Sequence, residues 1–89
     1  MNKVFFAGKL KVKPEVVYTP KGEKVVRFPL WIEEGDFSID VVCIDQQGLK
    51  DFDENIGKKI MVSGMLTKTL GRSRDVFTLK ANKILWMEE

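Results

Sequence analysis

Basic side chains gather in two segments of this chain, separated by an acidic segment, and this pattern favours binding of a polyanion. Residues 1–32 carry seven basic and two acidic side chains, residues 33–54 carry one basic and eight acidic, and residues 55–87 carry seven basic and one acidic. If folding brings the two basic segments together, their cations attract phosphate groups. The alternative is that they are solvated loop charges with local partners in Glu15, Glu23 and Asp75.

Surface aromatic rings that lie between cations can hold single-stranded nucleic acid, because bases stack on them. Trp31 and Arg27 alternate with the apolar residues of their segment, which places both on its outer side. Trp31 is therefore either a stacking platform or a surface contact, and Tyr18 either meets a base or packs under the turn that follows it. Phe5 faces away from the core, as interface residues do. Five aromatic residues are expected to be structural: Phe6, Phe28, Phe52, Phe77 and Trp86.

The residue sets of common catalytic and metal sites are missing. The chain has no histidine, which excludes Ser-His-Asp triads, Cys-His pairs and ordinary zinc sites. Cys43, the single cysteine, lies in an apolar stretch, as a buried inert thiol does. The acidic cluster at 51–55 has Ile56 and Val62 where a calcium loop needs glycine and glutamate, and no Gly-rich phosphate loop is present. We expect a protein that is not an enzyme and holds no cofactor and no metal.

The length and composition indicate one small globular domain over residues 1–89. Hydrophobic residues make up 44% of the chain and charged residues 31%. The longest apolar runs have four residues, whereas a membrane helix needs about 20. The first residues lack the apolar core of a secretory leader. We expect a cytoplasmic protein with no membrane segment and no C-terminal tail.

Period-two alternation predicts five strands at residues 3–10, 25–32, 37–44 and 60–66, and at 76–81 together with 84–87. Turn residues separate them: a Pro-Gly turn at 19–22, a short hairpin connection at 33–36 and a loop at 69–75.

One short helix is expected between the third and fourth strands. Leu49, Phe52 and Ile56 are spaced by three and four, Asp45 is a plausible N-cap, and Gly57 follows the last apolar residue. Three strands, a helix and two strands is the order of the all-β oligonucleotide-binding (OB) fold, a five-stranded, partly open barrel.

In an OB barrel, the loop between strands one and two and the loop between strands four and five flank the binding face. The expected nucleic-acid-binding residues are therefore the cations of these loops together with the outer residues of strand two: Lys11, Lys13, Tyr18, Lys21, Lys24, Arg27, Trp31, Lys68, Arg72 and Arg74.

The sequence resembles the bacterial single-stranded DNA-binding proteins. The residues that carry the resemblance are Asn2-Lys3-Val4, Gly8-x-Leu10, Pro14-Glu15, Tyr18-Thr19-Pro20-x-Gly22 and Phe28-x-Leu30. The resemblance implies binding of single-stranded DNA without sequence preference, in replication, recombination or repair, and association with the nucleoid. It also implies a homodimer or homotetramer that forms through the first strand, around Lys3, Phe5 and Ala7. RNA is an alternative ligand.

The chain departs from this family at the third strand, where family members carry aromatic residues on the DNA-facing side. Here Ser38, Asp40, Val42 and Ile44 occupy that side. The connection at 33–36 is short where the family has a long loop, and the family's acidic-tipped tail is absent. In these features the chain is similar to the primosomal replication protein n group.

Two functions stay open. The first is binding of single-stranded DNA across strands two and three. The second is an OB module for protein interaction or assembly, with weak or no DNA binding. Asp40 and Asp45 discriminate between them, because carboxylates that line the groove would repel a polyanion.

Overall fold

The computed structural model describes residues 2–44, 56–70 and 75–87 of the chain. Six strands run through these residues: β1 (Val4–Leu10), β2 (Glu15–Tyr18), β3 (Lys24–Ile32), β4 (Phe37–Ile44), β5 (Lys59–Leu70) and β6 (Asp75–Trp86). The described residues contain no helix, and so no helix that is long and apolar enough to span a bilayer. The helix expected between Asp45 and Gly57 falls almost entirely on residues 45–55, which lie outside the described part of the chain.

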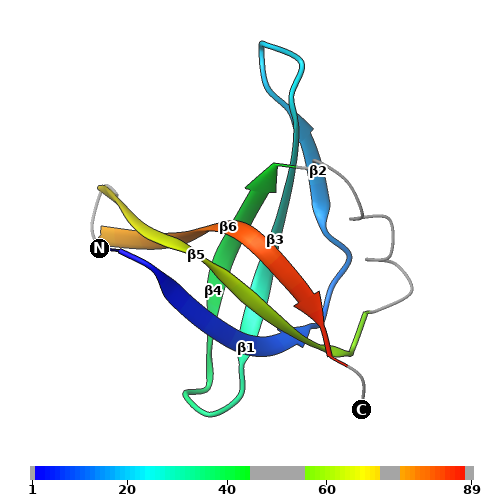
Figure 1. Ribbon diagram of the computed structural model, residues 1–89, viewed down its shortest axis with the longest axis vertical. Coiled ribbons are helices and arrows are strands. Elements are labelled where there is room, and N and C mark those ends of the chain that lie inside the picture. The colour runs from blue at the N-terminus through cyan, green and yellow to red at the C-terminus, as the bar shows by residue number, and fades with distance from the viewer. Residues whose placement is uncertain (1, 45–55, 71–74, 88–89) are drawn as a thin grey trace.

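Five of the strands form a closed barrel (Figure 1). Around the ring the order is β1, β5, β6, β4 and β3, with β4 and β6 parallel and the other pairs antiparallel. The ring closes where Lys9 pairs with Trp31 and Leu10 pairs with Leu30. The expectation of an all-β, five-stranded barrel is confirmed, and β1 meets β3 through these two pairs alone.

A glycine allows this closure. At Gly8 a Cβ atom would collide with the main-chain carbonyl oxygen of Trp31 and crowd the Leu30 side chain. Only a residue without a side chain lets β1 approach β3 this closely.

The strand β2 was not expected from the sequence. Its four residues pair with Lys24–Arg27 of β3, so Tyr18 lies in a strand and Lys24 begins the next one, and neither belongs to a loop. The cause is the tight turn at residues 19–22, where Gly22 has a φ of 86° and its N–H donates to the Thr19 carbonyl at 2.8 Å. A turn this short holds the residues on its two sides at pairing distance.

The core lies inside the barrel and is built by one face of each strand. In β3 the residues Val26, Phe28, Leu30 and Ile32 are buried, and in β4 Ile39, Val41 and Cys43 are buried, as the alternation predicted. The remaining buried apolar residues come from the strands around them: Leu10, Ile60, Val62 and Leu79. Phe6 and Trp86 are partly buried and pack against this core.

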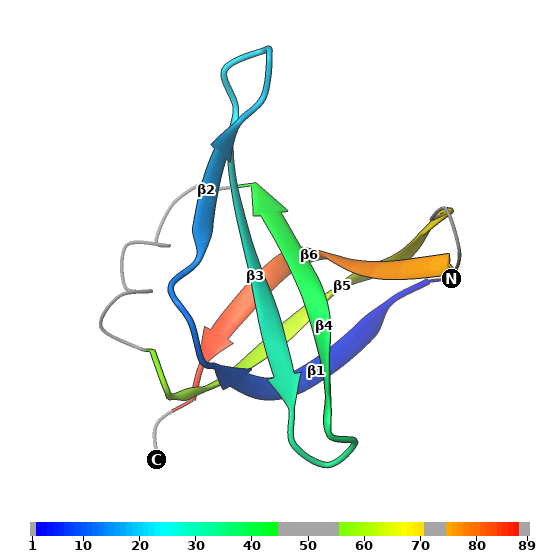
Figure 2. The ribbon, with the colours of Figure 1, turned by 180° about the vertical axis from the view of Figure 1, so that it is seen from behind.

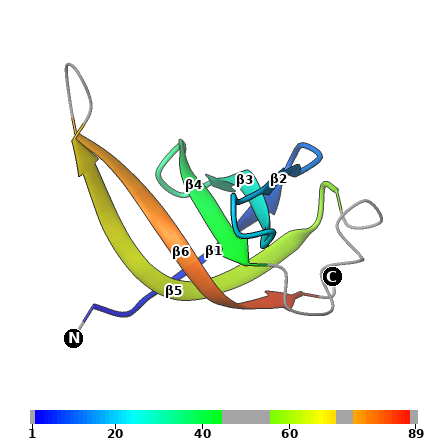
Figure 3. The same cartoon turned by 90° about the horizontal axis from the view of Figure 1, so that it is seen from above.

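Two hairpins extend beyond the barrel. Figures 1 and 2 show the β2–β3 hairpin rising above it, and Figure 3 shows β5 and β6 continuing together past the other strands. Because β5 runs to Leu70 and β6 starts at Asp75, the connection is shorter than the loop expected at 69–75.

The extension of β5 and β6 also corrects the expectation for Phe77. It shares the inner face of β6 with Leu79 but lies past the end of the barrel, and its side chain is 50% exposed. Phe77 is therefore a surface residue.

Candidate nucleic-acid interface

Trp31 lies on the outer face of β3, as predicted, and its ring is half-buried. The Lys11 ammonium nitrogen lies 4.4 Å from the centre of the Trp31 ring, a cation–π contact. Along the same face Arg27 is exposed four residues earlier in β3. The outer face of β3 thus carries a ring in contact with one cation and, four residues away, a second cation.

A groove of about 270 Å³ runs beside Arg27, and we call it the Arg27 groove. It contains two cations and two carboxylates, because Glu15 pairs with Arg27 across β2 and β3, and Asp40 pairs with Pro29 across β3 and β4. Its lining comprises Val12, Lys13, Glu15, Arg27, Phe28, Pro29, Asp40 and Val41. Near charge balance makes this groove a weaker attractor of phosphate than its lysine and arginine alone would suggest.

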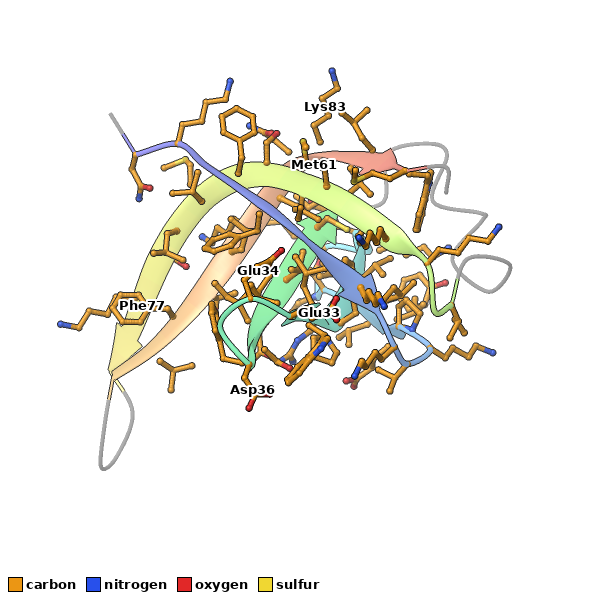
Figure 4. All side chains as sticks on the ribbon, turned by 90° about the horizontal axis from the view of Figure 1, so that it is seen from below. Glu33, Glu34, Asp36, Met61, Phe77 and Lys83 are labelled. Carbon is orange, nitrogen blue, oxygen red and sulfur yellow. The ribbon has the colours of Figure 1, made fainter. Side chains whose placement is uncertain are left out.

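A second groove, of about 410 Å³, lies between β4 and the extended part of β5 and β6, and we call it the Phe37 groove. Two phenyl rings open into it, because Phe37 is 44% exposed and Phe77 is 50% exposed. Its lining comprises Phe37, Ser38, Ile39, Asp40, Leu66, Val76 and Phe77. Figure 4 shows Phe77 near the start of β6, on the part of the β5–β6 hairpin that extends past the barrel.

Phe37 and Phe77 are not among the binding residues expected from the sequence. Both have the period-two phase of core residues, since Phe37 precedes Ile39 and Phe77 precedes Leu79 by two positions. Alternation reports only which face of a strand a residue occupies, and not whether the barrel still covers that face. The one signal available was their position at the start of a strand, next to a turn.

The two grooves share Asp40. On the outer face of the β3–β4 pair, Asp40 lies between Ser38, the partner of Trp31, and Val42, the partner of Arg27. A linear ligand that crosses from one groove to the other must pass this carboxylate. Asp40 therefore lies where it would repel a polyanion, the position that favours the protein-interaction alternative. Asp45, the other carboxylate that discriminates between the two functions, lies outside the described residues.

The structure does not bring all predicted binding residues together. Tyr18 is 67% exposed and pairs with Lys24, on the face of the β2–β3 hairpin opposite to the one that carries Arg27 and Trp31. Lys21 is exposed in the turn of that hairpin. These three residues therefore form a separate group from the Trp31 cluster.

On the other hairpin, Lys68 pairs with Phe77 and is exposed, two residues beyond Leu66 of the Phe37 groove. Arg72 and Arg74 lie outside the described residues. In the described ranges, no three Asp, Glu or Cys side chains are placed to hold a metal ion.

Solved structures with this fold include several single-stranded DNA-binding proteins. The wild-type single-stranded DNA-binding protein from Thermus aquaticus matches with a TM-score of 0.82 and 24% identity, over 100% of this chain and 41% of that one. The chain has their OB fold. It spans about two fifths of the length of the Thermus aquaticus protein.

Two shorter OB structures match over almost their whole length. The N-terminal domain of PriB from Thermoanaerobacter tencongensis, described as dimeric, matches with a TM-score of 0.71 and 19% identity, over 99% of this chain and 98% of that one. The SSB domain of a Synechococcus protein matches with a TM-score of 0.75 and 13% identity, over 96% of this chain and 94% of that one. No family model and no curated protein sequence matches the chain. The structural likeness agrees with the resemblance seen in the sequence.

Proposed function

We propose that this OB domain binds single-stranded DNA without sequence preference, across the outer face of β3 and β4. The observation that carries the proposal is the Trp31 ring with the Lys11 ammonium at 4.4 Å, on the outer face of β3 that also carries exposed Arg27. Bases stack on Trp31 and on the two phenyl rings of the Phe37 groove, while Lys11, Lys13 and Arg27 neutralise phosphates. The Thermus aquaticus protein of the same fold binds single-stranded DNA, which supports this assignment.

Lys11 has a specific part in this proposal. A base that stacks on the accessible side of Trp31 competes with the Lys11 ammonium for the ring. The displaced ammonium then lies within reach of the phosphate next to that base, so one lysine serves the free and the bound protein. Tyr18, Lys21 and Lys24 on one hairpin, and Lys68, Arg72 and Arg74 on the other, are proposed as contacts where the strand leaves the barrel.

Titration with oligo-dT at low salt tests the proposal. The Trp86→Phe variant leaves Trp31 as the single tryptophan, so fluorescence quenching reports on that ring alone. If about four cations contact phosphate, log K falls against log salt with a slope near −3, at about −0.7 per contact. Oligo-U in a parallel titration measures the preference for DNA over RNA. Absence of both quenching and gel retardation at low salt contradicts the proposal.

A second function is favoured by one observation, the position of Asp40 where the two grooves meet. In this alternative the domain is a protein-interaction or assembly module with weak or no DNA binding. The same titration separates the two functions, since a module of this kind leaves the Trp31 fluorescence unchanged.

We further propose that the domain forms a homodimer or homotetramer through β1. On one edge β1 pairs with β5 from Val4 to Lys9, while on the other edge only Lys9 and Leu10 pair with β3. An unpaired strand edge of this length favours antiparallel pairing with a second copy around Lys3, Phe5 and Ala7. Sedimentation equilibrium at micromolar concentration should give twice the 10.2 kDa chain mass or more, and a clean monomer would contradict the proposal.

The cellular role that we propose is protection of single-stranded DNA on the cytoplasmic nucleoid during replication, recombination or repair.

A further inference from the structure

The Phe37 groove combines two phenyl rings with two polar side chains. Phe37 and Phe77 are both exposed in it, and Ser38 and Asp40 also line it, two positions apart on the outer face of β4. In the described part of the chain, no side-chain hydrogen bond or ion pair engages Ser38 or Asp40. The groove therefore offers flat apolar surfaces together with a hydroxyl and a carboxylate that are open to a ligand.

The register of β4 and β6 accounts for this opening. The two strands pair from Asp40 with Thr78 to Val42 with Lys80. Phe37 and Phe77 precede the first of these pairs, on the parts of β4 and β6 that the pairing does not join. The groove volume of about 410 Å³ lies in the range of sites for small organic ligands. The space is large enough for one base of a nucleic-acid strand.

The Asp40 carboxylate acts in opposite ways on the two parts of a nucleotide. It repels a phosphate, whereas it accepts hydrogen bonds from N–H groups on the edge of a base. Single strands expose these edges, because no complementary strand covers them. A base that stacks on a phenyl ring of the groove can present its edge to the polar side chains while its phosphate stays on the far side of the sugar.

The edge of guanine fits the two polar side chains better than the edge of any other base. Guanine presents two adjacent donors, N1–H and the 2-amino group, which suit the two oxygens of one carboxylate. Its O6 acceptor lies next to N1–H and suits the Ser38 hydroxyl. Adenine and cytosine each present one amino group beside an acceptor nitrogen, and thymine presents a single N–H between two carbonyl oxygens. In these three bases the lone pairs of the acceptors face the carboxylate unfavourably.

We propose that the Phe37 groove selects guanine at one position of the bound strand, and that Asp40 determines this preference. The base stacks on the phenyl rings of the groove, its N1–H and 2-amino group donate to the Asp40 carboxylate, and the Ser38 hydroxyl donates to its O6. The inference rests on the proposed function, since the domain binds strands of any sequence and this one position adds a preference. A strand without guanine still binds, through Trp31 and the cations.

Anisotropy with labelled oligonucleotides tests the inference on the intact chain. The reference is oligo-dT, the probe is the same strand with one dG at its centre, and strands with one dA or one dC are the controls. The dG strand should bind about fivefold more tightly than oligo-dT, because a bidentate bond between a side chain and a base discriminates by a factor of this order or more. The dA and dC strands should bind as oligo-dT does.

Two modified bases identify the groups that are recognised. Inosine lacks only the 2-amino group of guanine, so its strand should lose most of the gain over oligo-dT. In 7-deazaguanine the edge that carries O6, N1–H and the 2-amino group is unchanged, so its strand should keep the gain.

Substitutions in the groove identify the residues. Asp40→Asn should raise the affinity for oligo-dT and reduce the gain from guanine to about twofold or less, since the amide has one acceptor oxygen and no charge. Ser38→Ala should reduce the gain in part, because it removes the donor to O6. Glu34→Gln, which removes a carboxylate that does not line the groove, should leave the gain unchanged.

The outcomes separate this inference from the proposed function. Absence of oligo-dT binding at low salt would overturn both. If oligo-dT binds and the dG strand binds no more tightly, or if Asp40→Asn keeps the full gain, this inference alone is overturned. A gain that the dA or inosine strand shares in full would also overturn it, because stacking of a purine would then be the cause.

Discussion

Trp31→Ala should weaken binding of oligo-dT by about 1 to 3 kcal/mol, the usual contribution of one base stacked on an aromatic ring. The substitution removes the ring and its contact with Lys11, and it leaves Arg27 and Lys13 in place. The slope of log K against log salt should stay as it is in the unmodified protein, because the number of phosphate contacts sets it. Trp31→Phe should retain most of the affinity, since a phenyl ring still stacks.

The stability cost of Trp31→Ala follows from the burial of the ring. A fully buried aromatic residue costs about 3 to 5 kcal/mol on truncation, so a half-buried ring should cost about 1 to 2 kcal/mol. The lost contact with Lys11 is included in that range, at about 0.5 to 1 kcal/mol. For a domain of this size, the expected fall in Tm is about 5 to 12 °C, which leaves the variant folded at room temperature.

Anisotropy of labelled oligo-dT measures the affinity without relying on tryptophan emission, and circular dichroism measures the Tm. Trp86→Ala is the matched control, because Trp86 packs against the core and should lower the Tm while affecting DNA only through unfolding. A folded Trp31→Ala protein with unchanged affinity would refute the stacking argument. An unfolded variant would show that the ring belongs to the core.

Three further substitutions test other parts of the structure. Asp40→Asn should raise oligo-dT affinity about threefold, measured by anisotropy, because the substitution removes a carboxylate where the grooves meet. Glu34→Gln removes an exposed carboxylate of the β3–β4 turn and should change the affinity less. Phe77→Ala should lower oligo-dT affinity by about 1 to 3 kcal/mol with little change in Tm, because the ring is exposed. Leu79→Ala, at a fully buried position two residues on, should cost about 2 to 5 kcal/mol of folding free energy. Equal Tm losses in the two variants would contradict the surface placement of Phe77. Gly8→Ala should lower the Tm by about 10 °C or more, which corresponds to a loss of about 2 kcal/mol in the free energy of unfolding, because the added Cβ collides with the Trp31 carbonyl oxygen where the barrel closes. An unchanged Tm would show that β1 can move away from β3 at little cost.

The periodicity of the sequence determined which face of each strand is buried. Val26, Phe28, Leu30 and Ile32 alternate with outward residues, and one face of a strand in a small barrel must bury its apolar side chains. The outward position of Trp31 follows from the same rule. Local chemistry also determined the Pro-Gly turn at residues 19–22. The sequence did not predict the strand β2 that precedes this turn, because its four exposed residues show no alternation of apolar and polar side chains.

Other features depended on contacts between distant segments. Phe37 and Phe77 have the phase of core residues, yet both are exposed. Phe77 lies where β6 runs past the barrel with β5, and Phe37 begins β4 before the residues of β4 that pair with β6, and local sequence encodes neither feature. Tyr18 and Trp31 lie on opposite faces of one hairpin, which only the pairing of Tyr18 with Lys24 decides. The placement of Asp40 between the two grooves likewise results from closure of the ring by β1 and β3 and from the parallel pairing of β4 with β6. Alternation along one strand specifies two faces, whereas the neighbours that cover or extend each face are chosen by the packing of the whole barrel.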